Sequence, residues 1–272
     1  MTSLEKPIKW FYVFSPRYEI FHIILRSLIG DNPNFDVKPI KVPQEAFSNT
    51  YKEGASHFLS GNSVKFKVLL DIMSNLPEGE QFIFSDADIF IQNLDGLIKL
   101  IKMHKDDELV FMHENENDNY KNIGFGLMKN TENNRWLHKE AMNRINTDCA
   151  LDQDAINAII GEYPEKYGAV KTFPRPEVSQ SNFADVGSSY MFQMLCSSKD
   201  PDANIFEKLI SAACASNIVP LKEKIQPNIW NTLIIWMKKN HPTNPLASES
   251  FVIPVISAVL GVSSIPLQAV PK

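Results

Sequence analysis

Two carboxylates stand two residues apart at the end of an apolar run, and their spacing could hold a divalent cation. Phe82, Ile83 and Phe84 form a typical buried strand, and Asp86 and Asp88 follow it. Side chains along a strand alternate between faces with a period of two, so both carboxylates are expected on one side. Carboxylate oxygens are the ligands that hard divalent cations prefer. A metal at the carboxyl end of a strand could neutralise a phosphate-rich ligand.

The same Asp-x-Asp pattern occurs three times, and only position distinguishes the copies. Such a triplet arises by chance roughly once in a chain of this length, so the bare pattern is weak evidence. Residues 152–154 precede a helical stretch, and residues 200–202 lie in a polar turn. Only Asp86 and Asp88 end an apolar strand. The alternative for this pair is that its carboxylates cap the following turn.

Composition excludes several classes of protein. The chain has 272 residues, of which 44% are hydrophobic and 22% charged, typical of a globular protein with a full core. Its net charge is -5, and no window is basic enough to follow a nucleic-acid backbone. Nucleic acid is therefore not an expected partner.

Cysteine usage and the amino-terminal residues favour a cytoplasmic protein. The three cysteines, Cys149, Cys196 and Cys214, are odd in number and have no C-x-x-C spacing, so a disulfide framework is not expected. Residues 1–9 lack the charged-then-apolar layout of a signal peptide.

The uncharged stretch at residues 251–271 is long enough to span a bilayer, although prolines, glycine and polar residues interrupt it. A packed carboxyl-terminal arm is the favoured interpretation, and peripheral membrane contact is the alternative.

The elements that must position these residues alternate between strand and helix. Strands are expected at residues 10–15, 36–42, 82–86, 108–113, 122–128 and 169–173, and helices at 19–28, 62–76, 94–103, 131–145 and 151–160. Pro39 makes the second strand an edge strand or a short one. After Pro176 helices are expected at residues 189–196, 205–215 and 229–239. The pattern predicts an α/β fold.

Four segments in this order resemble the nucleotide-diphospho-sugar transferases. They are a lysine on a helix, Ser85-Asp-Ala-Asp88, Asn122-Ile-Gly-Phe-Gly and Leu151-Asp-Gln-Asp-Ala-Ile-Asn157. The sequence is most similar to the metal-dependent glycosyltransferases of the type-A fold, which include glycogenin-like and bacterial galactosyltransferase-like enzymes. The resemblance covers about residues 10–190. It implies a Rossmann-like catalytic domain at residues 1–200 and a mostly helical extension at residues 201–272.

The resemblance assigns roles to particular residues. Asp86 and Asp88 correspond to the ligands of Mn²⁺ or Mg²⁺ on the donor diphosphate. The basic residue that contacts the donor corresponds to Lys67, with Lys65 as the second choice. Asn122 and Gly124 would line the donor sugar, and Ser15 and Ser85, at the ends of two strands, are further candidates for donor binding.

In the retaining members of the family an Asp-Gln-Asp segment lies beneath the anomeric carbon. Asp152, Gln153 and Asp154 are therefore the catalytic candidates, and an aspartate of this segment acting as base for inversion is the alternative. Asp152 could instead simply cap a helix, where a carboxylate contributes about 1 kcal/mol.

The family's third metal ligand, a later histidine, has no counterpart between His138 and His241. Asp185 is the candidate replacement, because Mg²⁺ and Mn²⁺ accept another hard oxygen ligand. The alternatives are that His241 folds back, that the third ligand is missing, or that Asp185 only caps a helix.

The resemblance implies a metal-dependent transfer of a sugar from a nucleoside diphosphate, usually uridine diphosphate, to the hydroxyl of a glycan or other acceptor, and it favours retention at the anomeric carbon. Two other functions stay open at this point. Haloacid dehalogenase-like phosphohydrolases also carry an Asp-x-Asp motif after an apolar strand, although usually at the start of the domain. A non-catalytic module that binds a sugar nucleotide or a glycan could keep the pocket without the chemistry.

Overall fold

The computed structural model describes residue 4 and residues 6–43, 57–114, 120–148, 151–180 and 188–194, together with Ile205 and Lys208. In this part of the chain six strands form one sheet in the order β2-β1-β3-β6-β5-β7. Their bounds are β1 Ile8–Phe14, β2 Phe35–Lys41, β3 Gln81–Asp86, β5 Leu109–His113, β6 Lys121–Lys129 and β7 Lys171–Thr172.

Five of these strands run in one direction, and β6 is antiparallel to both of its neighbours. The carboxyl ends of β1, β3 and β5 therefore lie beside the amino end of β6, along the side of the sheet that we name its carboxyl edge. The expected α/β class is confirmed, and so is the edge position of β2, the strand that contains Pro39.

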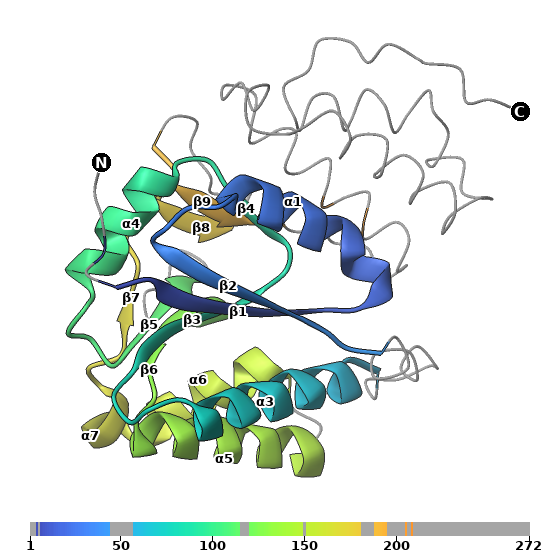
Figure 1. Ribbon diagram of the computed structural model, residues 1–272. Helices are drawn as coiled ribbons and strands as arrows, with labels where there is room; N and C mark the ends of the chain where they lie inside the picture. The colour runs from blue at the N-terminus through green and yellow to red at the C-terminus, as the bar shows by residue number, and fades with distance from the viewer. Residues whose placement is uncertain are drawn as a thin grey trace, which may run out of the picture.

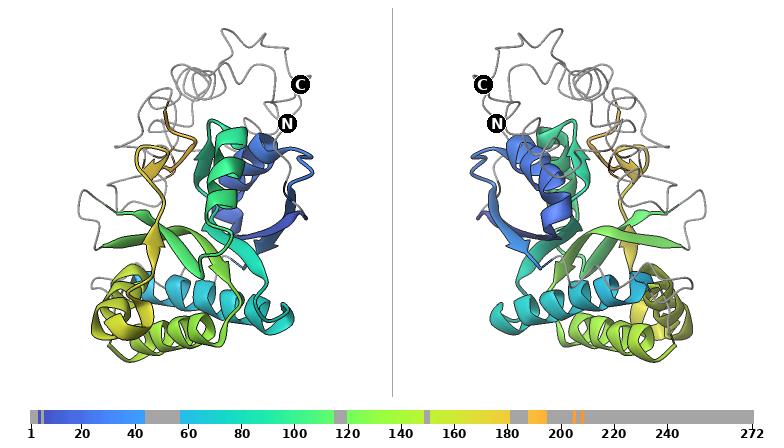
Figure 2. Two further views of the ribbon diagram at one scale, coloured as in Figure 1. Left: turned by 90° about the vertical axis from the view of Figure 1, so that its left-hand side faces the viewer. Right: turned by 90° about the vertical axis from the view of Figure 1, so that its right-hand side faces the viewer.

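Helices cover both faces of the sheet (Figure 1). One face packs against α3 His57–Asn75, α5 Glu132–Asp148, α6 Asp152–Glu162 and α7 Pro164–Tyr167. The other face packs against α1 Glu19–Ile29, which follows the turn η1 Pro16–Tyr18, and against α4 Leu94–Met103. In the side views of Figure 2 the sheet lies between these two groups of helices.

A second, smaller sheet lies beside α1 and α4 (Figure 1). Within the described residues it has three strands in the order β4-β9-β8, with bounds β4 Ile89–Ile91, β8 Val178–Gln180 and β9 Met191–Gln193. The sequence pattern predicted a helix at residues 189–196, and this prediction is wrong. Short runs that are buried on both faces have no period that separates strand from helix.

The local sequence explains where the helices begin and end. Asn93 caps α4, and its side-chain oxygen accepts a hydrogen bond from the Gly96 N–H at 2.9 Å. Thr131 caps α5 in the same way, because its hydroxyl accepts from the Asn134 N–H at 3.3 Å. Helix α1 ends at Gly30, whose φ of 59° lies in the left-handed region that glycine adopts without strain.

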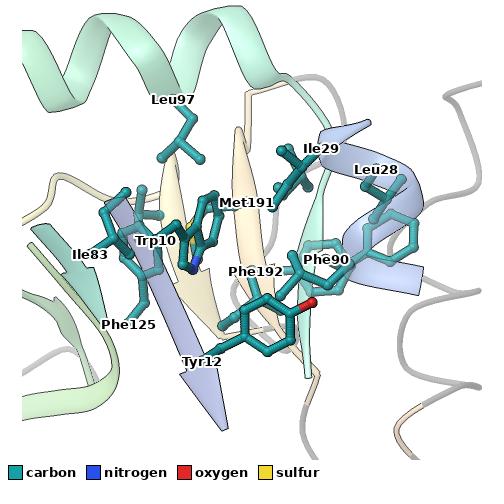
Figure 3. Close-up of a cluster of buried hydrophobic side chains, with 14 of the residues drawn as sticks. Trp10, Tyr12, Leu28, Ile29, Ile83, Phe90, Leu97, Phe125, Met191 and Phe192 are labelled. Atoms are coloured by element: carbon teal, nitrogen blue, oxygen red, sulfur yellow. The ribbon is translucent and has the colours of Figure 1, made fainter. Parts of the chain in front are cut away.

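An aromatic cluster fills the core between β1 and the α1–α4 layer (Figure 3). The Trp10 ring makes edge contacts with Phe35 and Phe125, with centroids 5.4 and 5.5 Å away. The indole N–H of Trp10 donates to the Ser85 hydroxyl at 2.8 Å, so the one polar group of this ring is satisfied. Burial and hydrogen bonding together fix β3 just before the acidic pair.

The remaining expected elements outside the described residues are the helices at 205–215 and 229–239 and the uncharged stretch at 251–271. Ile205 and Lys208 alone are described there, both with helical backbone. Among the described helices, none combines the length and hydrophobicity needed to cross a bilayer.

A buried histidine between α3 and α5 predicts one pH dependence of stability. Burial lowers the pKa of His138 to about 4, and Nδ1 of its ring lies 2.7 Å from the carbonyl oxygen of Asn134. Below pH 6.5 this histidine is protonated in the unfolded chain but stays neutral in the folded protein until the pH approaches 4. The unfolded state is therefore stabilised relative to the folded state as the pH falls toward 4. Between pH 7.5 and 4.5 the loss from this group should be about 2–3 kcal/mol.

The measurement is urea unfolding of wild type and His138→Met at both pH values. The variant removes the titrating group, so its stability should fall by about 2–3 kcal/mol less than that of the wild type. Equal losses in the two proteins would contradict the prediction.

Candidate functional site

The acidic pair lies where β3 ends at the carboxyl edge of the main sheet. Asp86 is the last residue of β3 and pairs in register with Val13 of β1. Asp88 lies between β3 and β4, and only 3% of its side chain is exposed. Because β3 and β4 are both held in sheets, the backbone that carries the two carboxylates is fixed on both sides.

The two carboxylates converge on one nitrogen atom. Nε2 of Gln193 donates to Oδ2 of Asp86 at 3.0 Å and to Oδ1 of Asp88 at 3.3 Å. Gln193 is the last residue of β9, which pairs with β4 so that Gln193 stands opposite Ile89. Sequence analysis did not single out Gln193, because this pairing joins segments about a hundred residues apart.

Lys65 of α3 connects Asp86 to the segment around Asp152. Its Nζ lies 2.6 Å from Oδ1 of Asp86 and 3.8 Å from Oδ2 of Asp152. Burial opposes the charge of Lys65, but the nearby carboxylates of Asp86 and Asp152 outweigh burial and raise its pKa. Lys65 therefore stays protonated in this environment.

Lys67, the lysine that the sequence favoured, is exposed to solvent. The helical spacing distinguishes the two lysines. Lys65 lies four and seven residues before the buried Leu69 and Ile72, whereas Lys67 lies four residues before the exposed Asp71. The spacing of the buried residues along α3 therefore indicates that Lys65, and not Lys67, lies on the side of the helix that faces the site.

Asp88 has a cationic partner of its own. The ammonium group of Lys208 forms an ion pair with Oδ2 of Asp88 and lies 5.2 Å from the centroid of the Tyr18 ring. Lys208 belongs to the segment that the sequence assigned to the carboxyl-terminal extension. Residues from both sides of the expected boundary at residue 200 therefore contribute to this site.

In the cluster formed by Asp86, Asp88, Asp152, Lys65 and Lys208, carboxylates outnumber ammonium groups. Burial raises the pKa of Asp86, and the Lys65 ammonium opposes that rise while Asp88 adds to it. The three carboxylates of Asp86, Asp88 and Asp152 face the two ammonium groups of Lys65 and Lys208. When all five groups are ionised, the cluster has a net negative charge, which would attract a further cation.

The Asp-Gln-Asp segment opens α6, and the structure separates its three members. Asp152 faces Lys65, and its Oδ1 also accepts from the N–H of Gln153 at 2.9 Å. Oε1 of Gln153 accepts from the N–H of Ile123 in β6 at 3.4 Å. Asp154 accepts a hydrogen bond from the Tyr120 hydroxyl in an exposed pair. Of the three catalytic candidates, Asp152 alone is in contact with the lysine of the acidic cluster.

The Asn-x-Gly segment at the start of β6 also reaches this edge. The buried side chain of Asn122 donates to Oε2 of Glu114 at 2.7 Å, and its Oδ1 accepts from the Gly124 N–H at 2.7 Å. Gln180 of β8 donates to the same Glu114 oxygen at 2.7 Å. Asn122 is therefore held in one orientation by both ends of its amide.

Gly124 leaves the space that the Gln193 side chain fills. A methyl group at position 124 would lie 2.5 Å from Oε1 of Gln193, which is closer than side-chain atoms approach one another. The absence of a side chain at this position therefore allows Gln193 to reach the two aspartates.

The two serines expected to bind the donor occupy different environments. Ser15 follows β1 at the carboxyl edge, where it is buried and its carbonyl accepts from the Tyr18 N–H at 2.9 Å. Ser85 is fully buried, and its hydroxyl accepts from Trp10 and donates to the carbonyl of Asp86 at 3.0 Å. The hydroxyl of Ser85 is buried and already makes two hydrogen bonds within the protein, so it has no exposed surface that a donor could contact.

Asp185 and His241, the candidates for a third metal ligand, lie outside the described residues. Within the described ranges no group of three or more histidine, cysteine, aspartate or glutamate side chains is arranged to hold a metal ion. The acidic pair itself supplies two converging carboxylates.

No protein-family model matches the sequence, and comparison with curated proteins gives no match either. Comparison of structures finds glycosyltransferases at low identity. The first is a glycosyltransferase involved in the glycosylation of the major capsid of PBCV-1, with 12% identity, a TM-score of 0.48 and coverage of 72% of this chain and 98% of that one.

Two further matches have similar values. The galactosyltransferase LgtC in complex with donor and acceptor sugar analogs is 11% identical, with a TM-score of 0.44 and coverage of 80% of this chain and 100% of that one. Mouse xyloside xylosyltransferase 1 is 12% identical, with a TM-score of 0.43 and coverage of 70% and 98%. Structural similarity at this level of identity concerns the path of the backbone. The chemistry therefore has to be inferred from this protein's own residues.

The buried lysine predicts a strong coupling between charge and stability. Lys65→Met leaves Asp86 and Asp152 without their ammonium partner, and breaking a buried pair from one side costs about 2–4 kcal/mol when one partner is partly exposed. Lys65→Arg keeps the charge and is the matched control. Urea unfolding at pH 7 measures the loss.

The double variant Lys65→Met with Asp86→Asn should recover about half of that loss, because both members of the closest pair become neutral. A double variant as unstable as the sum of the single variants would contradict the coupling.

Proposed function

We propose that this protein is a glycosyltransferase that moves a sugar from a nucleoside diphosphate, preferably uridine diphosphate, to the hydroxyl of an acceptor. The observation that supports this most is the convergence of Asp86 and Asp88 on one point at the carboxyl edge of the sheet, beside a buried lysine. Ligands of α/β proteins bind at this edge. A glycan or another hydroxyl compound is the proposed acceptor.

The donor atoms at this point fit a hard divalent cation. Carboxylate oxygens are preferred by Mg²⁺ and Mn²⁺, and the net negative charge of the cluster favours a cation. Asp86 and Asp88 would hold the ion, which supplies a Lewis acid that stabilises the leaving diphosphate. Mn²⁺ or Mg²⁺ is therefore the proposed cofactor.

The chain's own residues would supply the remaining functions. Lys65 holds its ammonium group between Asp86 and Asp152, so it brings positive charge to the place where a diphosphate would lie. In the transfer, the bond between the anomeric carbon and the phosphate oxygen breaks, and the diphosphate takes the electron pair. The acceptor oxygen forms the new bond to the anomeric carbon and passes its proton to the departing diphosphate oxygen.

Retention of configuration is proposed on the basis of the Asp-Gln-Asp segment. Asp152 is the member that shares Lys65 with the acidic pair, so it is the best placed to stabilise positive charge near the anomeric carbon. Gln153 lies against β6 and would line the same region, and Asp154 is farther out with Tyr120.

The experiment is a thermal-shift panel of sugar nucleotides with and without Mn²⁺, followed by transfer assays with the donor that binds. A donor at a concentration 100-fold above its dissociation constant stabilises the folded state by about 2.7 kcal/mol, which corresponds to a rise of about 5–10 °C in Tm. The rise should require Mn²⁺ and should disappear in Asp88→Asn, which removes one carboxylate. The exposed Asp95→Asn on α4 is the matched control and should behave as wild type.

Other results would favour the other functions. Hydrolysis of a generic phosphate ester, without affinity for sugar nucleotides, would identify a phosphohydrolase. Tight binding of a donor with neither transfer nor hydrolysis across many acceptors would identify a binding module. Full metal-dependent turnover in Asp88→Asn would refute the proposal itself.

A further inference from the structure

We infer that Gln193 is a ligand of the divalent cation, in addition to Asp86 and Asp88, and binds it through its side-chain oxygen. This inference rests on the proposed function, because it concerns the same cation. Within the described part of the chain, Gln193 is the side chain that makes hydrogen bonds to both Asp86 and Asp88. It therefore already occupies the point at which the two carboxylates converge.

The position of Gln193 is fixed by backbone pairing on both sides of its strand. It stands opposite Ile89 in β4 and beside Gln180 in β8, and the N–H of the next residue, Met194, donates to the carbonyl of Asp88 at 2.9 Å. The backbone of β9 is thus bonded to the residue whose carboxylate its side chain meets. A ligand on a rigid strand keeps its geometry without ordering a loop.

Gly124 completes the arrangement from the main sheet. In the antiparallel register of β3 and β6, Ser85 stands opposite Phe125, so the next pair places Gly124 beside Asp86. The Gln193 amide lies over this glycine, in space that any other residue would fill. The two sheets therefore meet at Gln193 with an opening that fits its amide.

An amide can serve this site both with and without a cation. When no cation is bound, the NH₂ group donates to the two carboxylates and offsets part of their repulsion. A half-turn about the last side-chain bond exchanges nitrogen and oxygen, and this bond has broad, roughly two-fold preferences. The amide oxygen is then a hard ligand of the kind that Mg²⁺ and Mn²⁺ accept.

The other polar groups that the structure describes at this site are less suited to this role. Lys65 and Lys208 are ammonium groups, which donate hydrogen bonds and have no lone pair to give while protonated. Asp152 is linked to the acidic pair through the ammonium group of Lys65, from which it lies 3.8 Å, and Glu114 is engaged by Asn122 and Gln180. Among the described side chains, Gln193 is the one that contacts both aspartates and also has an oxygen that can bind a cation.

The test is direct binding of Mn²⁺ without donor, measured by electron paramagnetic resonance of the free ion. Gln193→Met keeps the length of the side chain but removes the oxygen, and its Mn²⁺ affinity should fall about 10–100-fold. Gln193→Glu supplies a carboxylate and should bind at least as tightly as wild type. Gln180→Met, on the adjacent strand and facing Glu114, is the matched control and should leave Mn²⁺ affinity unchanged.

Gln193→His gives a readout that a purely structural role would not produce. If position 193 coordinates the ion, pulsed electron paramagnetic resonance of bound Mn²⁺ should detect a directly bound nitrogen that wild type lacks. Thermal melts of all variants check that they fold.

The possible failures are distinguishable. If Asp88→Asn loses Mn²⁺ binding while Gln193→Met binds as wild type and Gln193→His shows no bound nitrogen, the role of Gln193 is refuted and the cation site stands. If wild type does not bind Mn²⁺ at all, both the role of Gln193 and the metal dependence of the proposed function are refuted.

Discussion

The structure depends on the compensation of negative charge that is brought together at the edge of a sheet. Asp86, Asp88 and Asp152 come from three places in the chain, and their mutual repulsion in a partly dry environment has to be offset. Lys65 and Lys208 supply ammonium groups, and Gln193 supplies an amide to the closest pair. Without these partners the carboxylates would be costly to bury.

The same compensation explains why two sheets are needed. The main sheet presents Asp86 at the end of β3 and leaves space at Gly124, while the smaller sheet delivers Gln193 on β9. Asp88 lies on the connection between them. The backbone that carries the acidic pair is therefore held on both sides, and rigidity lowers the cost of holding like charges close together.

Much of the fold could be predicted from the sequence, because periodic burial marks strands and helices before residue 176. The predicted helix at 94–103 matches α4, and the strand ending at Asp86 matches β3. The helix expected at 189–196 is β9 instead, because a short apolar run buried on both faces looks the same in either state. That local ambiguity also concealed Gln193, whose side chain contacts both aspartates.

The sequence by itself determined the α/β alternation and the position of Asp86 and Asp88 at the end of a buried strand, since an apolar run that stops at two carboxylates marks the point where the strand leaves the core. Only the tertiary structure decided which residues meet them. It selected Lys65 over Lys67, placed Ser85 in the core against Trp10, and brought Gln193 and Lys208 to the aspartates. The physical reason is that local periodicity fixes the face on which a side chain lies, whereas contacts between distant segments depend on strand pairing and packing of the whole domain.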